Sequence, residues 1–506
     1  MNRTKSNILA NFTGRFATAA ISIVFVPLYL RYLGVELYGL IGFFLSIQAI
    51  LMLLDGGITP TLGREVARLS VFPEESQTLR NLSRTLEIFC WGAAIIACGA
   101  VMIAAPLLAD HWLRSENVPP VTVRDALLLM SASFLFQWAT TFYSGGLDGL
   151  QEQKARNIVT VTLSLIRALA SLAVLRYYSA TIQAFLVCQL VTTVLQSALL
   201  GSYFWWRLPA APLGATFDLT ALKNIWRYAA GIAGTTVAVL ILTQSDKLIL
   251  SRMLSLEEFG YYSLAVTLSA AAIGMIVGSI QTVYFPQFTQ AVASESTAAG
   301  ISELYHRACQ VMSFFLLPVA VTLVFFSYDV LILWTGNVDI ANNTYLLLTL
   351  VVIGTGLNGL MYLPYFAQLA HGITKIGFWQ NVIGIIFLVP FMIFATMRWG
   401  AVGGALTWVL LNFSYSFTGI QIMHRMILRG EAKRWFIEDV GVPIALTAGV
   451  GAGCLLLARA WDRTEPTRLR SLIVVFAAFS LTTFVSAFAT PTARYFLFHR
   501  ILRYES

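Results

Sequence analysis

Charged side chains are scarce in this sequence. Only 11% of the 506 residues are Asp, Glu, Lys or Arg, whereas a soluble domain carries about 25%. So few charges cannot cover a water-exposed surface, which excludes an ordinary soluble protein. Long apolar runs take their place, and 58% of the residues are hydrophobic. The composition predicts an all-α, multi-pass membrane protein, because helices satisfy their own backbone hydrogen bonds in lipid.

Motifs of nucleotide, metal and hydrolase sites are also missing. The sequence has no GxxxxGK[ST] phosphate loop, no HExxH metal motif and no GxSxG nucleophile motif. Its five histidines are scattered, and its five cysteines lie in apolar stretches without metal or disulfide spacing: Cys90, Cys98, Cys188, Cys309 and Cys454. We therefore expect no enzyme activity and no cofactor. The coupling ion, H⁺ or Na⁺, stays open.

Apolar runs of about 20 residues predict fourteen membrane spans. The first is too long for a cleavable signal peptide and predicts an uncleaved span. The predicted spans cover residues 8–30, 39–58, 86–108, 124–144, 157–177, 180–204, 225–245, 260–288, 309–333, 343–369, 376–397, 401–423, 439–458 and 471–489.

The net charge of +8 indicates membrane orientation rather than nucleic-acid binding. An even number of spans puts both termini on one side, and most Lys and Arg residues fall in segments on that side. Because such residues collect in the cytoplasm, both termini are predicted to be cytoplasmic. The segment 459–470 disagrees, since it carries four arginines yet falls outside. The topology of the last two spans is therefore the weakest part of this prediction.

A short internal repeat divides the chain. RYLGVELYG (31–39) and RMLSLEEFG (252–260) align without gaps at an offset of 221 residues. A second pair, 146–157 and 368–381, falls near the same offset. Six predicted spans separate the members of each pair, so the two halves have the same orientation. Transporters built from parallel repeats place their substrate between the halves.

The repeat predicts two six-helix lobes followed by two extra helices. We assign residues 1–210 to the first lobe, 211–424 to the second, and 425–506 to the additional helices and a cytoplasmic tail.

Two arginines lie inside predicted spans. Arg15 is in the first span and Arg167 is near the middle of the fifth. A charge at bilayer depth costs roughly 2.5–3.5 kcal/mol on insertion scales and usually faces a wet cavity or a partner. Guanidinium groups suit phosphate oxygens, so both are candidates to bind an anionic headgroup. The alternative is that they cap carbonyls, reach the interface or pair with an acid on another helix.

Other charged residues mark the membrane boundaries. Candidates for gating or ion coupling are Asp55, Asp246 and Lys247, although an interfacial structural role explains them equally well. Candidates for receiving a headgroup at the cytoplasmic entrance are Arg64, Lys154 and Arg156, although a solvated positive face also accounts for them.

Several stretches resemble one transporter family. YLGVELYGL, LLDGGI with the downstream Arg64, GGLDGLQEQKARN, QSDKLILSRMLSLEEFGYYSLA and YLPYFAQLAHGITK are similar to recurring patterns of the polysaccharide transporter family. This family comprises the O-antigen and exopolysaccharide flippases of the multidrug/oligosaccharidyl-lipid/polysaccharide exporter superfamily. The resemblance extends from about residue 8 to 424.

The resemblance implies two facing six-helix lobes with a cationic central cavity, which agrees with Arg15 and Arg167. It also implies alternating-access transfer of an undecaprenyl-diphosphate-linked oligosaccharide to the outer leaflet of a bacterial inner membrane. Expected partners are that substrate, membrane lipids, and polysaccharide polymerase and chain-length proteins. Two alternatives stay open: a cation-coupled small-molecule or drug antiporter of the same fold, and a membrane-embedded glycan polymerase or ligase.

Overall fold

The chain is helical throughout its described length. The computed structural model describes residues 3–55, 57–218, 244–294, 297–373, 375–461 and 467–494. Within these ranges the only β-type pairing is one isolated bridge, between Arg114 and Ser255. Eleven helices of the same ranges are long and apolar enough to cross a membrane. The predicted all-α, multi-pass architecture is confirmed.

Two of these eleven helices each join two predicted spans: α12 (Lys375–Met426) contains both of its spans, and α1 (Arg3–Leu51) contains the first span and residues 39–51 of the span predicted at 39–58. Helix α1 is broken at Gly34, and α12 is broken at Gly400. The sequence predicts short loops there, but the structure keeps helix on both sides of a single glycine. Gly34 has φ 79°, a conformation that side chains with a Cβ rarely adopt. The predicted span 225–245 lies almost wholly outside the described residues, so the total of fourteen stays a prediction.

The chain forms two compact units, Met1–Gly260 and Tyr261–Ser506. Residues 219–243, which include the start of the predicted second lobe, lie outside the described part. The predicted division at 210 and 424 therefore stays a prediction.

The helical elements of the first unit are α1, η1 (Met52–Asp55), α2 (Ile58–Leu69), η2 (Pro73–Glu75), α3 (Ser76–Leu107), η3 (Leu108–Trp112), α4 (Pro120–Gly149), α5 (Gln153–Tyr177), α6 (Ile182–Arg207) and the helical residues 244–253.

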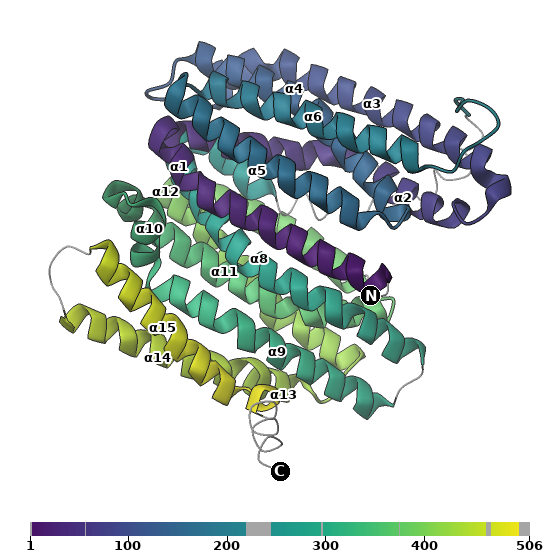
Figure 1. The fold of residues 1–506 in the computed structure, drawn as a ribbon. Helices are drawn as coiled ribbons and strands as arrows, with labels where there is room; N and C mark the ends of the chain where they lie inside the picture. Colours follow the sequence, from purple (N-terminus) through teal and green to yellow (C-terminus); the bar gives the residue numbers. More distant parts are fainter. Residues whose placement is uncertain are drawn as a thin grey trace. The chain divides into compact units, whose positions relative to one another are not determined.

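In the first unit, α4 packs against α2, α3 and α6, while α5 packs against α1 and α6 (Figure 1). Helices α1 and α5 run in the same direction. Near their N-terminal halves the Asn157 amide donates to Asn11 Oδ1 at 2.7 Å, and further along both helices the Tyr29 hydroxyl donates to the Ala168 carbonyl at 3.3 Å. A shared direction is what the predicted topology requires of spans one and five.

The two repeated segments meet within the first unit. A Cβ added to Gly39 would lie 2.1 Å from the Leu256 carbonyl oxygen, and one added to Gly260 would lie 2.3 Å from that of Val35. The offset of 221 residues exchanges Val35 with Leu256 and Gly39 with Gly260. The two contacts are therefore equivalents under the repeat. Such close backbone approach requires a residue without a side chain at both positions.

The second unit has a helical core with two helices packed on it. Helix α11 packs against α9 and α12, and α14 and α15 pack against each other and against α9 (Figure 1). The helical elements are α8 (Leu256–Ala293), whose first residues belong to the first unit, α9 (Ala298–Phe325), α10 (Ser327–Thr335), α11 (Val338–Ala370), α12 (Lys375–Met426), α13 (Ala432–Arg434), η4 (Trp435–Gly441), α14 (Val442–Trp461) and α15 (Arg468–Ala489).

Helix α15 is held at both ends. At its start the Ser471 hydroxyl donates to Asp329 Oδ1 in α10 at 2.7 Å. Just after its end, the backbone and hydroxyl of Thr492 donate to Gln310 Oε1 in α9 at 3.0 and 2.6 Å. The start of α15 therefore lies beside α10, and Thr492 lies beside Gln310 of α9. Residues 462–466 of the arginine-rich segment 459–470 lie outside the described part, so the topology of the last two spans stays a prediction.

Candidate functional site

Arg167 lies on α5 and is held by neutral groups of α6. Its Nε donates to the Thr192 hydroxyl at 3.1 Å, and its Nη2 donates to Gln196 Oε1 at 2.7 Å. Thr192 is 6% exposed and Gln196 is 5% exposed, so both partners are fixed by packing. Among the described residues, no carboxylate forms an ion pair with this guanidinium. The positive charge is oriented but not neutralised.

Arg15 lies on α1 beside a polar cluster that joins three helices. We call this the α1–α5 cluster; its members are Asn11 of α1, Asp148 of α4, and Arg156 and Asn157 of α5. Asp148 pairs with Arg156 at 2.7 Å, and Arg156 also donates to Asn11 Oδ1 at 2.9 Å. The Arg15 side chain is exposed and acts electrostatically on the Asp148 carboxylate. The charges of Asp148 and Arg156 balance within the cluster, and Arg15 adds a positive charge beside it.

The two candidate arginines lie at different depths. Arg15 follows Asn11 by one helical turn, and Asn11 is bonded to Asn157. Arg167 follows Asn157 by ten residues on α5, which is about 15 Å along a helix. The structure thus places them on neighbouring parallel helices at separate levels. This spacing suits successive contacts with a moving anion better than two simultaneous contacts with one phosphate.

Asp55 is bonded as a helix cap. Its carboxylate accepts the Thr59 backbone N–H at 3.1 Å and the Thr59 hydroxyl at 2.9 Å, which closes the first turn of α2. It also accepts the Trp138 indole N–H of α4 at 3.3 Å. These contacts explain a structural role for Asp55, and a gating role stays a prediction.

The remaining candidates are distributed over other segments. Lys247 donates to Gln244 Oε1 at 3.2 Å, and its predicted switching with Asp246 stays a prediction. Arg64 on α2 lies 3.5 Å from Glu65 and its side chain is 52% exposed. Lys154 is exposed at the start of α5. Within the described contacts, Arg156 is the only member of the predicted entrance group that joins the α1–α5 cluster.

One buried carboxylate of the first unit, Glu87, is neutralised by its own partners. Glu87 is 5% exposed; it pairs with Arg84 at 2.6 Å and accepts bonds from Tyr143 at 2.6 Å and Trp205 at 3.0 Å. Arg84 neutralises the negative charge of Glu87, and the hydrogen bonds from Tyr143 and Trp205 occupy its acceptor positions. Glu87 therefore has an ionic partner, whereas Arg167 has none among the described residues.

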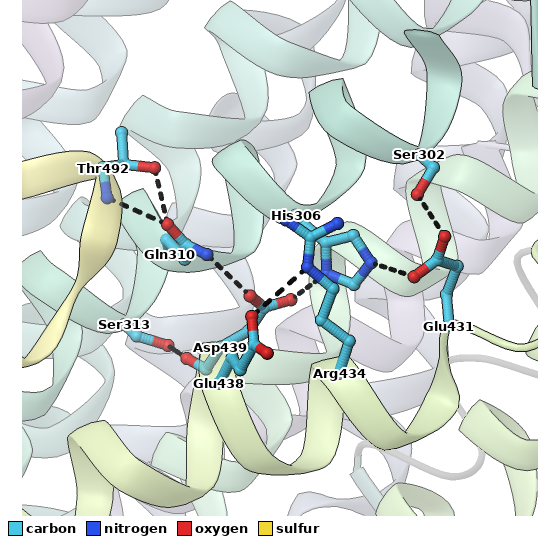
Figure 2. Close-up of polar contacts among 9 residues, drawn as sticks. All are labelled: Ser302, His306, Gln310, Ser313, Glu431, Arg434, Glu438, Asp439 and Thr492. Carbon is cyan, nitrogen blue, oxygen red and sulfur yellow. Dashed lines mark hydrogen bonds and ion pairs between the residues drawn. The ribbon is translucent and has the colours of Figure 1, made fainter. Parts of the chain in front are cut away.

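A second buried polar cluster lies in the other unit (Figure 2). His306 of α9, 1% exposed, contacts Asp439 of η4 through Nδ1 at 2.5 Å and Glu431 through Nε2 at 3.0 Å. Ser302 donates to Glu431 at 2.7 Å, and Gln310 donates to Asp439 at 3.0 Å. We call these five residues the His306 cluster.

Sequence reasoning missed the His306 cluster for a physical reason. His306 and Asp439 are 133 residues apart, and neither belongs to a spaced motif. The available signal was positional: both lie at span ends that the even span count places on one side of the membrane. That signal indicates a shared side but not contact.

Comparisons with known proteins identify relatives and the fold. Residues 4–292 match the model of a family described as "Polysaccharide biosynthesis protein". A Shigella flexneri protein named as an O-antigen transporter is 21% identical over 405 residues, which is 79% of this chain and 93% of that protein. Both matches agree with the resemblance inferred from the sequence.

Two solved structures are similar over most of the chain. The lipid II flippase MurJ in an inward closed conformation gives a TM-score of 0.68 at 15% identity, covering 95% of this chain and 98% of that one. An inward-facing multidrug resistance transporter of the MATE family and MOP superfamily gives 0.66 at 13% identity, covering 85% and 96%. At these identities the likeness shows the fold alone, which is a MurJ- and MATE-like transporter fold.

Proposed function

Because the chain belongs to the polysaccharide biosynthesis protein family, we propose that it is a flippase for an undecaprenyl-diphosphate-linked oligosaccharide. It moves this lipid from the cytoplasmic to the outer leaflet of a bacterial inner membrane, by alternating access and without covalent chemistry. Both termini are cytoplasmic. Polymerase and chain-length proteins use the product for cell-surface polysaccharide assembly.

One observation carries the anionic part of this proposal. Arg167 sits in the middle of an apolar helix and, within the described contacts, is held by the neutral groups of Thr192 and Gln196. A guanidinium inside an apolar span normally costs free energy unless an anion pairs with it. A pyrophosphate supplies that anion, and its oxygens match the donor geometry of arginine. The substrate therefore completes an interaction that the protein leaves incomplete.

The α1–α5 cluster gives the headgroup a first contact. Arg15 is exposed beside Asp148 and Arg156, nearer the N-terminal ends of α1 and α5 than Arg167. An anion that contacts Arg15 first and Arg167 next would move along two parallel helices. The sugars and the diphosphate need such polar surroundings. A polar group that leaves water without finding a new hydrogen-bond partner costs several kcal/mol. The polyprenyl tail stays in lipid.

We expect the energy for transport to come from a source other than nucleotide hydrolysis by this chain. With no phosphate loop in the sequence, the transport cycle draws on the membrane potential, an H⁺ or Na⁺ gradient, or consumption of the product.

Alanine substitutions test the anion-binding role. We expect Arg15→Ala and Arg167→Ala to lower surface polysaccharide about tenfold or more in cells lacking the native copy, the effect of losing a charge-assisted hydrogen bond. Cytoplasmic-leaflet lipid-linked oligosaccharide should accumulate, and Arg167→Lys should restore part of the activity. Membrane levels of each variant are measured in parallel.

The matched control is Arg124→Ala, which removes an arginine that is already paired with Asp125 at 2.8 Å. This variant should retain wild-type polysaccharide. Normal polysaccharide in both the Arg15 and Arg167 variants contradicts the proposal. Unchanged polysaccharide with altered drug susceptibility instead supports the antiporter alternative.

A further inference from the structure

His306 makes two hydrogen-bond contacts with carboxylates, but a neutral histidine can donate only one hydrogen bond to ionised acids. Both ring nitrogens of His306 face carboxylate oxygens, at 2.5 Å and 3.0 Å. Each N···O contact needs a proton between its atoms, and a neutral imidazole supplies only one. The second proton must come from solution, and we place it on the ring, which lies between two carboxylate oxygens.

Groups around His306 favour keeping this additional proton. Asp439 is fully buried, while Glu431 is 29% exposed and connects the site to water. The hydrogen bond from Ser302 lowers the pKa of Glu431 below its usual value; burial opposes this effect and His306 reinforces it. Glu431 is therefore an ionised partner. The pair of carboxylates around one imidazole provides the negative charge that holds the proton.

Other titratable groups lie close to His306 on each element that contributes to the cluster. On α9 the ring of Tyr305 packs edge-on against His306, and Cys309 lies near Asp439. Tyr305 also packs edge-on against His424 of α12, on which His306 acts electrostatically. Arg434 of α13 acts on Glu431 and Asp439 and pairs with Glu438 at 3.3 Å.

The cluster also fastens helices together. Asp439 precedes α14 and is bonded to His306 and Gln310 of α9. The other side of the Gln310 amide accepts both bonds from Thr492, just after α15. The Ser313 hydroxyl of α9 donates to the Asp439 carbonyl at 2.6 Å. Loss of the proton would leave two lone pairs facing each other in a buried site, which weakens this attachment.

We propose that His306, Asp439 and Glu431 form a proton-binding site whose bound proton fastens α14 and α15 to α9. The site is in the second unit and does not depend on the substrate proposed above. Because the attachment requires the proton, it is strongest at low enough pH to keep the proton bound and is lost as the pH rises through its release. Acidification that protonates Glu431, below its lowered pKa, weakens the contact from the other side.

Nitrogen-15 NMR of the five histidines tests the proton directly. The full chain is labelled with ¹⁵N-histidine, reconstituted in liposomes and recorded from acidic to alkaline pH. At neutral pH, His306 should show two protonated ring nitrogens, assigned by the signal lost in His306→Asn. His424 is the internal control, since its Nδ1 faces a single carbonyl, that of Ile420, at 2.8 Å; it should show a neutral ring.

Asp439→Asn should convert His306 to a neutral ring while the signal of His371, which faces the Ala367 carbonyl of its own helix, is unchanged. A neutral His306 ring in the wild-type protein at neutral pH overturns the proposal.

Hydrogen exchange tests the attachment. In His306→Asn at neutral pH, segments 431–441 and 486–494 should exchange about tenfold faster, the effect of losing a hydrogen bond to a charged group. Segment 471–480 should be unaffected, because Asp329 holds that end of α15. The matched control is His371→Asn, whose Nδ1 faces only the Ala367 carbonyl of its own helix. Unchanged exchange at 486–494 in His306→Asn contradicts the attachment.

Discussion

At the scale of single residues, charges with and without an ionic partner differ in what they leave for a ligand. Glu87 and Asp148 are paired with arginines of the first unit, whereas Arg167 is bonded to an amide and a hydroxyl. An ion pair neutralises much of the charge of both members. The half-buried guanidinium of Arg167 has neutral partners, which is why we propose it as a ligand-binding group.

The substitution Gln196→Glu distinguishes a ligand-binding arginine from a structural one. The new carboxylate would lie at the position of Gln196 Oε1, 2.7 Å from Arg167 Nη2, with almost the same shape. We expect transport to fall about as much as in Arg167→Ala, because the guanidinium is neutralised while the protein stays folded. Measurement of surface polysaccharide and of thermal unfolding in detergent checks both parts.

Thr192→Ser is the matched control, because it keeps the hydroxyl that accepts from Arg167, and it should retain transport. If Gln196→Glu transports normally and raises the unfolding temperature, Arg167 serves only to hold α5 to α6.

The sequence predicts where the two arginines are but not what they contact. Their depth follows from apolar runs around Arg15 and Arg167. Thr192 and Gln196 are 25 and 29 residues from Arg167 on another helix, and their faces depend on how α5 rotates against α6. That rotation is set by packing, which no local pattern encodes.

At the scale of elements, the two repeated segments, 31–39 and 252–260, make close backbone contact with each other. The nine-residue match at 31–39 and 252–260 suggested duplication, and the structure adds that Gly39 and Gly260 approach Leu256 and Val35 reciprocally. Side-chain-free positions on both segments let α1 and α8 approach to backbone distance. The sequence shows that the two segments resemble each other, but that they touch can be known only from the folded structure.

Gly39→Ala and Gly260→Ala should each impair the protein. The new methyl group would lie 2.1 or 2.3 Å from a backbone oxygen, so α1 and α8 must separate. Overpacking of this kind costs about 1–3 kcal/mol, and we expect lower unfolding temperatures in detergent and reduced transport. The controls are Gly92→Ala and Gly99→Ala, where an added Cβ meets nothing within 4 Å. Equal behaviour of all four variants argues against the contact.

At the scale of the whole molecule, composition predicts the fold class and the recurring sequence patterns predict the family. Few charges and repeated apolar runs predict an all-α membrane protein, which eleven spanning-length helices in the described ranges confirm. The family resemblance is confirmed by the match over residues 4–292. The connections are less predictable, because Gly34 and Gly400 each replace an expected loop with a single non-helical residue.

Long-range polar clusters are the part that sequence patterns cannot supply. His306 is 125 residues from Glu431 and 133 residues from Asp439, and each alone is an ordinary polar residue at a span end. Their meeting follows from the packing of α14 and α15 on α9, which is a property of the folded second unit.

Transbilayer movement in a purified system tests the central claim most directly. The protein is reconstituted in liposomes with an undecaprenyl-diphosphate-linked oligosaccharide, and a lectin that cannot cross the bilayer reports the fraction in the outer leaflet over time. We predict movement with the wild-type protein and with Arg124→Ala, and about tenfold slower movement with Arg167→Ala and Gln196→Glu. Wild-type liposomes that move no lipid, or Arg167→Ala liposomes that move it at the wild-type rate, would contradict the account.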